Sequence, residues 1–191
     1  MRLKDQQKFE SIVVSTIELV TKNGFDNVSI KKIAKRANVS PATIYIHFKN
    51  KNDLFEKIYI KIREEISTGT LTGINEIPED DIERIFKLIW KNSFSYNLEH
   101  PEFLKYREKF EQTSLIENIR HIEIELQTFV KNLFHSGIEN KIIKNLPIFM
   151  LITFAYVPII SLLKLHFTRD FIMDDFQIDT ACNFAWKSIK L

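Results

Sequence analysis

The amino-acid sequence predicts an all-α protein, with an N-terminal three-helix domain followed by a C-terminal helical bundle. The 191 residues include only 4 Gly and 5 Pro but 16 Phe, so residues that break helices are scarce and bulky apolar side chains are abundant. Apolar residues also recur at helical spacing through most of the chain, and no long stretch shows the period of two that strands require. These observations favour long packed helices over a turn-rich β fold.

The formal net charge is only +2, but it is unevenly distributed. Residues 1–66 carry 13 Lys and Arg against 8 Asp and Glu, whereas residues 67–191 carry 14 against 17. No acidic residue occurs between Asp26 and Asp53, a stretch that contains six Lys and Arg residues. A basic N-terminal third on a mildly acidic body indicates a module that binds a polyanion, unless it is simply a solvated helical face that lacks acids.

Cys182 is the only cysteine, which excludes a disulfide framework within the chain and favours a reducing, cytoplasmic compartment. Its apolar surroundings are typical of a core residue, although a thiol sensor stays open. The first ten residues are polar and charged, so no secretory signal is expected. His121, Glu123 and Glu125 lack the spacing of a metal site, and no cofactor or catalytic motif stands out. We therefore expect neither a metal site nor an enzyme.

The first 66 residues predict four helices. Apolar residues from Phe9 to Val20 follow helical spacing, and Gly24 stands where a helix end requires a left-handed residue. Ser29 then opens a short second helix as its N-terminal cap.

A tight turn separates the second helix from the third. Asn38 tolerates the positive φ of such a turn, and Ser40 followed by Pro41 is a strong helix start. Asn50, with Asp53 three residues later, resembles a capping box and begins a fourth helix. The predicted order is a long helix, a short helix, a tight turn, a short helix and a long helix.

The clearest break in the chain is the loop predicted at 67–78, which contains two Gly residues and a Pro. We predict one domain over residues 1–50 and a second over 51–191, in which residues 51–66 form a connecting helix. Beyond the loop, helical spacing predicts five further helices over Asp80–Leu98, Pro101–Gln112, Leu115–Ser136, Leu146–Phe167 and Asp174–Ile189.

The stretch Asn145–Leu163 contains no charged residue and is nearly long enough to cross a bilayer. Its Asn, Thr, Tyr, Ser and Pro residues lower its hydrophobicity below that of a leucine-rich span. A helix that is apolar on all sides is also expected where its own domain covers one side and a second subunit covers the other. We favour this second interpretation and expect no membrane partner.

Residues 24–54 show the pattern of a helix-turn-helix. Such a motif needs a small residue where its two helices cross, and Ala34 occupies that position. Asn38 supplies the tight turn, while Val39 and Ile44 are the apolar anchors of the second helix. In this motif the first helix lies across the DNA backbone and the second enters the major groove.

The same stretch closely resembles the DNA-binding region of the tetracycline-repressor (TetR) family. That region has a Gly-aromatic pair after its first helix, a Ser or Thr at the start of the second, and Thr-x-Tyr in the third. The departures are Asn38 in place of the usual Gly and Ile44 in place of the usual Leu. The matching residues are Gly24, Phe25, Ser29, Ile33, Ala34, Ala37, Val39, Ser40, Thr43, Ile44, Tyr45, His47, Phe48 and Lys51.

The resemblance implies that the first turn of the third helix meets bases or nearby phosphates, and that Tyr45, His47 and Lys51 hold the phosphate backbone. Because Pro41 and Ala42 cannot make bidentate base contacts, recognition is expected to use thymine methyl groups and DNA shape as well as hydrogen bonds. The predicted DNA-contact residues are Ser29, Lys31, Ser40, Pro41, Ala42, Thr43, Tyr45, Ile46, His47, Lys49 and Lys51.

For the C-terminal part, the resemblance implies a ligand-binding and dimerisation bundle whose last two helices pair between subunits. A two-fold dimer places two recognition helices about 34–36 Å apart, which suits adjacent major grooves on a palindromic operator. The many aromatic residues of the bundle either form an ordinary core or line a pocket for an apolar or flat aromatic effector, such as an acyl compound or a lipophilic drug. The candidate ligand-binding residues are Trp90, Phe94, Phe103, Tyr106, Phe110 and Phe154.

The sequence therefore predicts a cytoplasmic, homodimeric transcriptional repressor that a small apolar or aromatic ligand releases from double-stranded DNA. Two alternatives stay open. In the first, the chain is a DNA-binding regulator that acts without a small molecule. In the second, it is a helical membrane-associated protein whose basic N-terminal third binds anionic lipid. The tight turn and the Ser40–Pro41 helix start argue against the second alternative, because lipid contact requires no such geometry.

Overall fold

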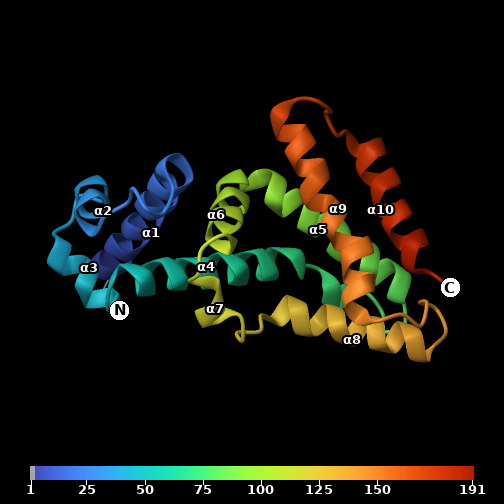
Figure 1. Ribbon diagram of the computed structural model, residues 1–191. Coiled ribbons are helices and arrows are strands. Elements are labelled where there is room, and N and C mark those ends of the chain that lie inside the picture. The colour runs from blue at the N-terminus through green and yellow to red at the C-terminus, as the bar shows by residue number, and fades with distance from the viewer. Residues whose placement is uncertain (1–2) are drawn as a thin grey trace. The chain divides into compact units, whose positions relative to one another are not determined.

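The computed structural model describes residues 3–191, which form helices and no β-strand (Figure 1). The prediction of an all-α fold is confirmed. An isolated antiparallel bridge joins Ile143 to Lys190. The elements are α1 (Leu3–Asn23), α2 (Ile30–Arg36), α3 (Pro41–His47), α4 (Lys51–Thr70), the short 3-10 helix η1 (Ile74–Glu76), α5 (Ile82–Glu99), α6 (Pro101–Glu111), α7 (Ile116–Ile119), α8 (Glu125–Glu139), α9 (Ile148–Thr168) and α10 (Asp175–Ile189).

The chain divides into two compact units. The first consists of Met1–Arg63 and His100–Ile122, and the second of Glu64–Glu99 and Glu123–Leu191. The first unit thus contains α1, α2, α3, most of α4, α6 and α7, while the second contains η1, α5, α8, α9 and α10.

Short polar side chains fix the ends of the N-terminal helices, as the sequence predicts. The hydroxyl oxygens of Ser29 and Ser40 each accept a hydrogen bond from the backbone N–H three residues later, at 3.3 and 3.1 Å. Gly24 has a φ of 77° after α1, and Asn38 has a φ of 54° between α2 and α3. These caps satisfy N–H groups that a helix start leaves without partners, and the two left-handed residues end the helices before them.

An aromatic cluster forms the centre of the first unit. The ring of Phe25, just after α1, meets the rings of Phe55, Tyr106 and Phe110 edge-on, with centroids 4.8, 5.2 and 5.7 Å away. The hydroxyl of Tyr106 donates to the carbonyl oxygen of Phe55 at 3.1 Å. The helix α6 therefore packs with α1 and α4, although it lies far beyond the predicted boundary at residue 50.

In the second unit, α5 packs against α8, α9 and α10. The ring of Phe86 on α5 lies 5.2 Å from that of Trp186 and 5.5 Å from that of Tyr156. The indole N–H of Trp90 donates to the carbonyl oxygen of Ala155 at 2.9 Å, and both groups are buried. This bond satisfies the one polar atom of a large core side chain and attaches α5 to α9.

Cys182 lies on the buried side of α10, with 1% of its surface exposed. Burial raises the pKa of its thiol to about 11, and the charge of Asp179 adds to this, against the opposing effect of Lys91 and Lys87. The reactive form of cysteine is the thiolate, and a raised pKa makes this form scarce near neutral pH. The structure therefore supports a core residue at Cys182 better than a thiol sensor.

The predicted helix over Leu115–Ser136 is wrong, because the structure has α7 and α8 there, separated by non-helical residues. Three of the four residues 120–123 are ionisable. A helix that continued through them would therefore have no apolar face to bury there. The chain also passes from the first unit to the second after Ile122. The side chain of Gln127 accepts a hydrogen bond from the backbone N–H of Ile124 at 3.2 Å and so stabilises the start of α8.

The loop predicted at 67–78 begins too early, because α4 continues to Thr70. Ser67 and Thr70 are buried, and the Ser67 hydroxyl accepts a hydrogen bond from the backbone of α8 at 3.0 Å. Gly69 lies so close to the ring of Tyr96 that any side chain would collide with it. Tertiary packing thus holds the last turn of α4 in spite of its weak helix formers.

Candidate nucleic-acid interface and ligand site

The helices α2 and α3 form a helix-turn-helix with a short, fixed turn. The backbone N–H of Val39 donates to the carbonyl oxygen of Ala34 at 3.0 Å, directly after the left-handed Asn38. Ala34 is 2% exposed and Ile44 is completely buried. The inner face of α3 is therefore anchored, and its opposite face points away from the core.

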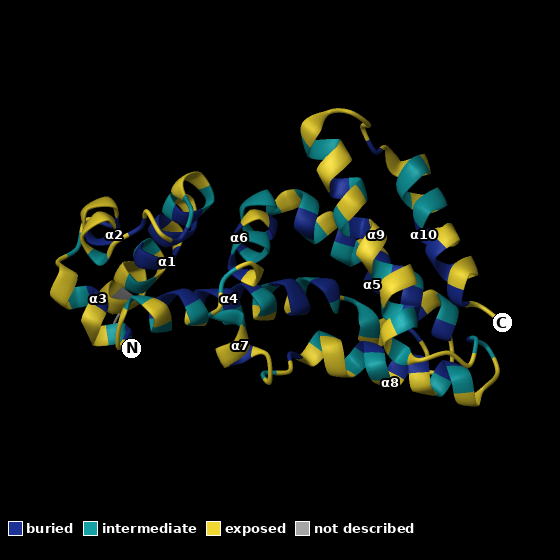
Figure 2. Cartoon of the chain, viewed as in Figure 1, coloured by how far each residue is buried: buried dark blue, intermediate teal, exposed yellow. Residues whose placement is uncertain are grey.

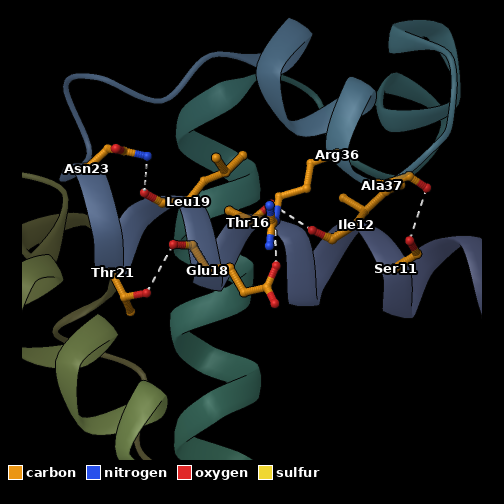
Figure 3. A network of polar contacts seen from close by, with 9 residues as sticks. All are labelled: Ser11, Ile12, Thr16, Glu18, Leu19, Thr21, Asn23, Arg36 and Ala37. Carbon is orange, nitrogen blue, oxygen red and sulfur yellow. Dashed lines mark hydrogen bonds and ion pairs between the residues drawn. The ribbon is translucent and has the colours of Figure 1, made fainter.

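Polar contacts attach α2 to α1 (Figure 3). The hydroxyl of Ser11 donates to the carbonyl oxygen of Ala37, the cap of α2, at 3.0 Å. The guanidinium of Arg36 forms an ion pair with Glu18, which contributes little on its own because both side chains are half exposed. The two contacts tie the end of α2, and with it the turn into α3, to the long helix α1.

All the predicted DNA-contact residues reach the surface of the first unit. Thr43, His47 and Lys51 are half-buried, and the others are exposed. On the outer face of α3, Tyr45 is 54% and Ile46 is 77% exposed. Large apolar side chains exposed side by side are typical of a contact surface.

The three half-buried residues make contacts that limit their freedom. The ring of His47 lies edge-on to that of Phe9, with centroids 5.5 Å apart. The ammonium of Lys51 lies 5.4 Å from the ring centroid of Phe55, and the hydroxyls of Ser40 and Thr43 share a hydrogen bond of 2.9 Å. Such packing orders a side chain before its ligand arrives.

A charged side chain joins α3 to α4. One carboxylate oxygen of Asp53 accepts a hydrogen bond from the backbone N–H of Lys49 at 2.8 Å and lies 3.0 Å from the ammonium of Lys57. The side-chain oxygen of Asn50 accepts from the backbone N–H of Asp53 at 2.9 Å. The Lys57 ammonium also donates to the carbonyl oxygen of His47, the last residue of α3, at 3.4 Å. The sequence-based set omitted Lys57, although its position four residues after Asp53 was an available signal.

We expect Asp53→Asn to weaken this joint and lower the free energy of unfolding by about 1 kcal/mol near neutral pH. Partial burial raises the pKa of Asp53, but the Lys49 N–H and the Lys57 ammonium lower it more, to below the ordinary value. A carboxylate whose pKa is lowered by folding stabilises the protein above its unfolded-state pKa, near pH 4, and this effect is lost as the pH falls through the folded-state pKa. The difference between the two proteins should therefore shrink below about pH 4.

Urea unfolding of both proteins between pH 7 and pH 3 measures this difference. Asn52→Ala, at an exposed position of the same helical turn, is the control and should leave the stability unchanged. A loss of stability that is the same at every pH would contradict the role given to the Asp53 charge.

The six candidate ligand-binding residues belong to both units rather than to one. Four of them are fully buried, Phe103 is half-buried with its ring stacked on His100 at 5.1 Å, and Phe154 is 57% exposed. Phe103, Tyr106 and Phe110 lie in the first unit, and Trp90, Phe94 and Phe154 lie in the second.

The second unit contains an open cavity of about 490 Å³ along α9 and α10, and of the six candidates only Trp90 and Phe154 line it. The sequence-based set thus omitted most of its lining. Four further apolar or aromatic residues face it, together with two alanines and two residues that carry hydroxyl groups. These residues are Val157, Pro158, Leu162, Phe184, Ala181, Ala185, Thr153 and Ser161.

Exposed residues occur along both α9 and α10 (Figure 2), and several of them have large apolar side chains. Phe149, Val157 and Phe184 are 70, 54 and 68% exposed. On α10 the exposed Phe184 lies opposite a buried face that contains Trp186. The sequence signal for this surface is a helix with apolar residues on two opposite faces, because the chain itself can cover only one of them.

The helix α9 is also long and apolar enough to cross a bilayer, with a mean hydropathy of 2.1, and 22% of that window is buried within the described chain. One such helix is weak evidence for a membrane protein, because the covered helix of a subunit interface has the same composition. Among residues 3–191, no group of three or more His, Cys, Asp or Glu side chains is placed to hold a metal ion.

Two family models match the chain. The model of the family described as bacterial regulatory proteins, tetR family, matches residues 12–58. The model described as the tetracyclin repressor-like C-terminal domain matches residues 82–190, which is more than half of the chain. The first match covers the helix-turn-helix, and the second covers the helices α5 to α10.

Among curated relatives, an HTH-type transcriptional regulator of Haemophilus influenzae is 30% identical over 111 residues, which are 58% of this chain and 58% of the relative. The fatty acid metabolism regulator protein of Bacillus subtilis is 36% identical over 52 residues, which are 27% of each chain. The chain therefore matches little more than half the length of the first relative and about a quarter of the second.

Solved structures match this chain over a greater length than the curated relatives do. A TetR family transcription regulator from Marinobacter aquaeolei VT8 has a TM-score of 0.85 at 27% identity, covering 100% of this chain and 99% of the other. The regulator FadR of Bacillus subtilis, in complex with stearoyl-CoA, has a TM-score of 0.72 at 20% identity, covering 94% of this chain and 96% of the other. The second likeness concerns the fold alone.

Proposed function

Since the chain belongs to the TetR family of bacterial regulatory proteins and is a DNA-binding transcriptional regulator, we propose that it is a cytoplasmic repressor that binds its operator as a homodimer. A small apolar or aromatic ligand releases it. The observation that supports this proposal most directly is the outer face of α3, whose residues are exposed. The helix itself is held in place by the hydrogen-bonded turn before it, by the Ser40 cap and by the buried residue Ile44 on its inner face.

In this proposal the start of α3 reads the DNA and its surroundings hold the backbone. Ala42 and Ile46 are exposed and apolar, which suits contact with thymine methyl groups in the major groove. His47 and Lys51 are ordered by aromatic neighbours and direct polar groups to phosphates, which supply affinity without sequence information. The exposed N-terminus of α2 at Ser29 is a further phosphate site.

A second copy of the chain is the proposed occupant of the apolar surface on α9 and α10. An interface of this kind is isologous, so the same residues of both copies meet across a two-fold axis. The open cavity and the exposed side chains of Phe149, Phe154 and Phe184 support this proposal, because together they form a shaped apolar surface rather than scattered residues.

An acyl compound is the proposed effector. Support comes from the fatty acid metabolism regulator of Bacillus subtilis among the relatives. A ligand acts only through its difference in affinity between two arrangements of the helices. Because α4 follows α3 after three residues, an effector that shifts α4 also shifts the recognition helix.

We expect an acyl effector to weaken operator binding by about tenfold or more, which is within the typical range of coupling between two sites. An operator is first selected from a pool of randomised DNA duplexes with the purified protein. Fluorescence anisotropy on that operator is then repeated with increasing oleoyl-CoA, oleate and a lipophilic cationic dye.

Release by one of these compounds, with coenzyme A alone as the control, would support the proposal. If the operator is bound tightly but none of the compounds changes its affinity, the ligand-free alternative gains support, in which a protein partner or constant occupancy regulates the gene. If no duplex is enriched over the random pool, the DNA-binding proposal itself is wrong.

A further inference from the structure

The cavity along α9 and α10 has the size and the lining of a site for a small organic molecule. Its volume of about 490 Å³ falls within the range of about 300–1,000 Å³ that ligand sites in proteins occupy. The aromatic residues Trp90, Phe154 and Phe184 line it. Ala181 and Ala185, one helical turn apart on α10, line it as well, so this wall of the cavity consists partly of short side chains.

Two polar groups of the lining already have hydrogen-bond partners within the chain. The indole N–H of Trp90 donates to the carbonyl oxygen of Ala155 at 2.9 Å, and the hydroxyl of Thr153 donates to the carbonyl oxygen of Phe149 at 2.7 Å. None of the described residues that line the cavity is charged. A charged ligand would therefore lose its hydration there without gaining an ion pair, which is costly. The cavity suits an uncharged molecule.

A proline inside α9 leaves a hydrogen-bond acceptor at the wall of the cavity. In an α-helix, the carbonyl oxygen of residue 154 points toward residue 158 and accepts a hydrogen bond from its N–H. Pro158 occupies that position and has no N–H, so it cannot make this bond to the carbonyl oxygen of Phe154. Both residues line the cavity. The carbonyl oxygen of Phe154 can thus accept a hydrogen bond from a ligand.

We propose that this cavity binds a small uncharged aromatic molecule, which donates one hydrogen bond from an N–H or O–H group to the carbonyl oxygen of Phe154. The aromatic lining supplies the apolar contact, and the single acceptor fixes the orientation of the ligand. This ligand differs in class from the acyl effector proposed above, because the charged head group of an acyl compound does not suit an uncharged cavity. The inference rests on the proposed function in one respect, the second copy that covers the open side of the cavity.

This cover links the ligand to the dimer. In a single chain the open side of the cavity leaves part of a bound molecule in contact with water, and a second copy over α9 and α10 would exclude that water. The ligand would then bind the dimer more tightly than the monomer. By linkage it would stabilise the dimer by the same free energy.

Equilibrium dialysis of the full chain against two matched compounds tests the hydrogen bond. Diphenylamine is uncharged near neutral pH and has one N–H, and diphenylmethane has a CH₂ group in its place. We expect Pro158→Ala to lower the ratio of diphenylamine affinity to diphenylmethane affinity by about threefold to tenfold. The alanine N–H would bond to the Phe154 carbonyl and so remove one hydrogen bond to the ligand. Because alanine is the best helix former, the variant should fold.

A second variant tests whether the compounds occupy the cavity itself. Ala181→Leu places a larger side chain in the cavity and should weaken binding of both compounds by about tenfold or more, since it takes up the space of the ligand. Asn183→Leu adds the same side chain at an exposed position of α10 outside the lining and should bind both compounds like the parent. In analytical ultracentrifugation, diphenylamine should keep the parent dimeric at lower protein concentrations than buffer alone.

The proposal is overturned if the parent binds neither compound, or if Ala181→Leu binds both as the parent does. It is also overturned if Pro158→Ala leaves the ratio of the two affinities unchanged, since the Phe154 carbonyl would then not contact the ligand. Failure of the proposed function gives a different result. A parent that sediments as a monomer with and without diphenylamine contradicts the homodimer, whereas a ratio that responds to Pro158→Ala still supports the ligand site.

Discussion

Replacing Ala42 with glutamate is expected to abolish operator binding and to leave the folded protein otherwise unchanged. Ala42 is exposed in the first turn of α3, next to the Ser40 cap. Because its side chain contributes nothing to the core, a longer side chain there meets solvent in the free protein. In the complex the new carboxylate would face the acceptor groups of the major groove and the nearby phosphates. We expect a loss of about 100-fold or more, because an unfavourable contact at a base typically costs about 1–3 kcal/mol and both subunits carry it.

Fluorescence anisotropy on the selected operator and on a scrambled duplex, across a salt series, measures this loss. Gln112→Glu adds the same charge at an exposed position directly after α6 and should bind DNA like the parent. Lys51→Ala should weaken binding to both duplexes alike and flatten the log–log salt slope by about 0.9 per subunit, as expected for a lost phosphate contact. If Ala42→Glu binds the operator like the parent, α3 is not the recognition helix and the proposed function loses its main support.

The local geometry of the helix-turn-helix was predictable because its signals are local. A serine that caps a helix and an asparagine that adopts a positive φ act through bonds to their near neighbours. The structure has these features at Ser29, Asn38 and Ser40. Residues that act through the chain's own backbone within three or four positions can be identified without knowledge of the fold.

Features that depend on distant packing were not predictable in the same way. The end of α4 at Thr70 depends on a contact between the backbone of α8 and Ser67, and on the fit of Gly69 to Tyr96. Helical periodicity alone predicted that one helix continues through residues 120–124. In the structure these residues are not helical, and the chain passes there from the first unit to the second. In both places tertiary structure overrides the local preference.

The candidate ligand residues show the same difference between pattern and placement. Tyr106 and Phe110 have the aromatic character of a ligand pocket, but their rings pack on Phe25 in the first unit. Phe184, which the sequence-based set omitted, lines the cavity on α10. A periodic pattern identifies an apolar face of a helix, but it does not say what covers that face.

The surface of α9 and α10 allows a direct test of what covers it. Phe184 is 68% exposed and lines the cavity, so it contributes little to the fold of a single chain. In a two-fold dimer the same side chain is buried twice, once from each copy. Burying a phenylalanine contributes about 2 kcal/mol, so losing two of them removes about 4 kcal/mol from the dimer, before the cost of burying a charge is counted.

We therefore expect Phe184→Glu to convert a dimer into a monomer, with the dissociation constant of the dimer raised about 1,000-fold or more. In analytical ultracentrifugation the parent should sediment at about twice the chain mass of 22.6 kDa, and the variant at the mass of one chain. Val14→Glu makes the same kind of change at a 53% exposed residue of α1, and it should remain dimeric. Operator affinity should fall with Phe184→Glu, since a monomer reads only one half-site. A parent that sediments as a monomer, or a Phe184→Glu variant that stays dimeric, would show that a second copy does not cover this surface.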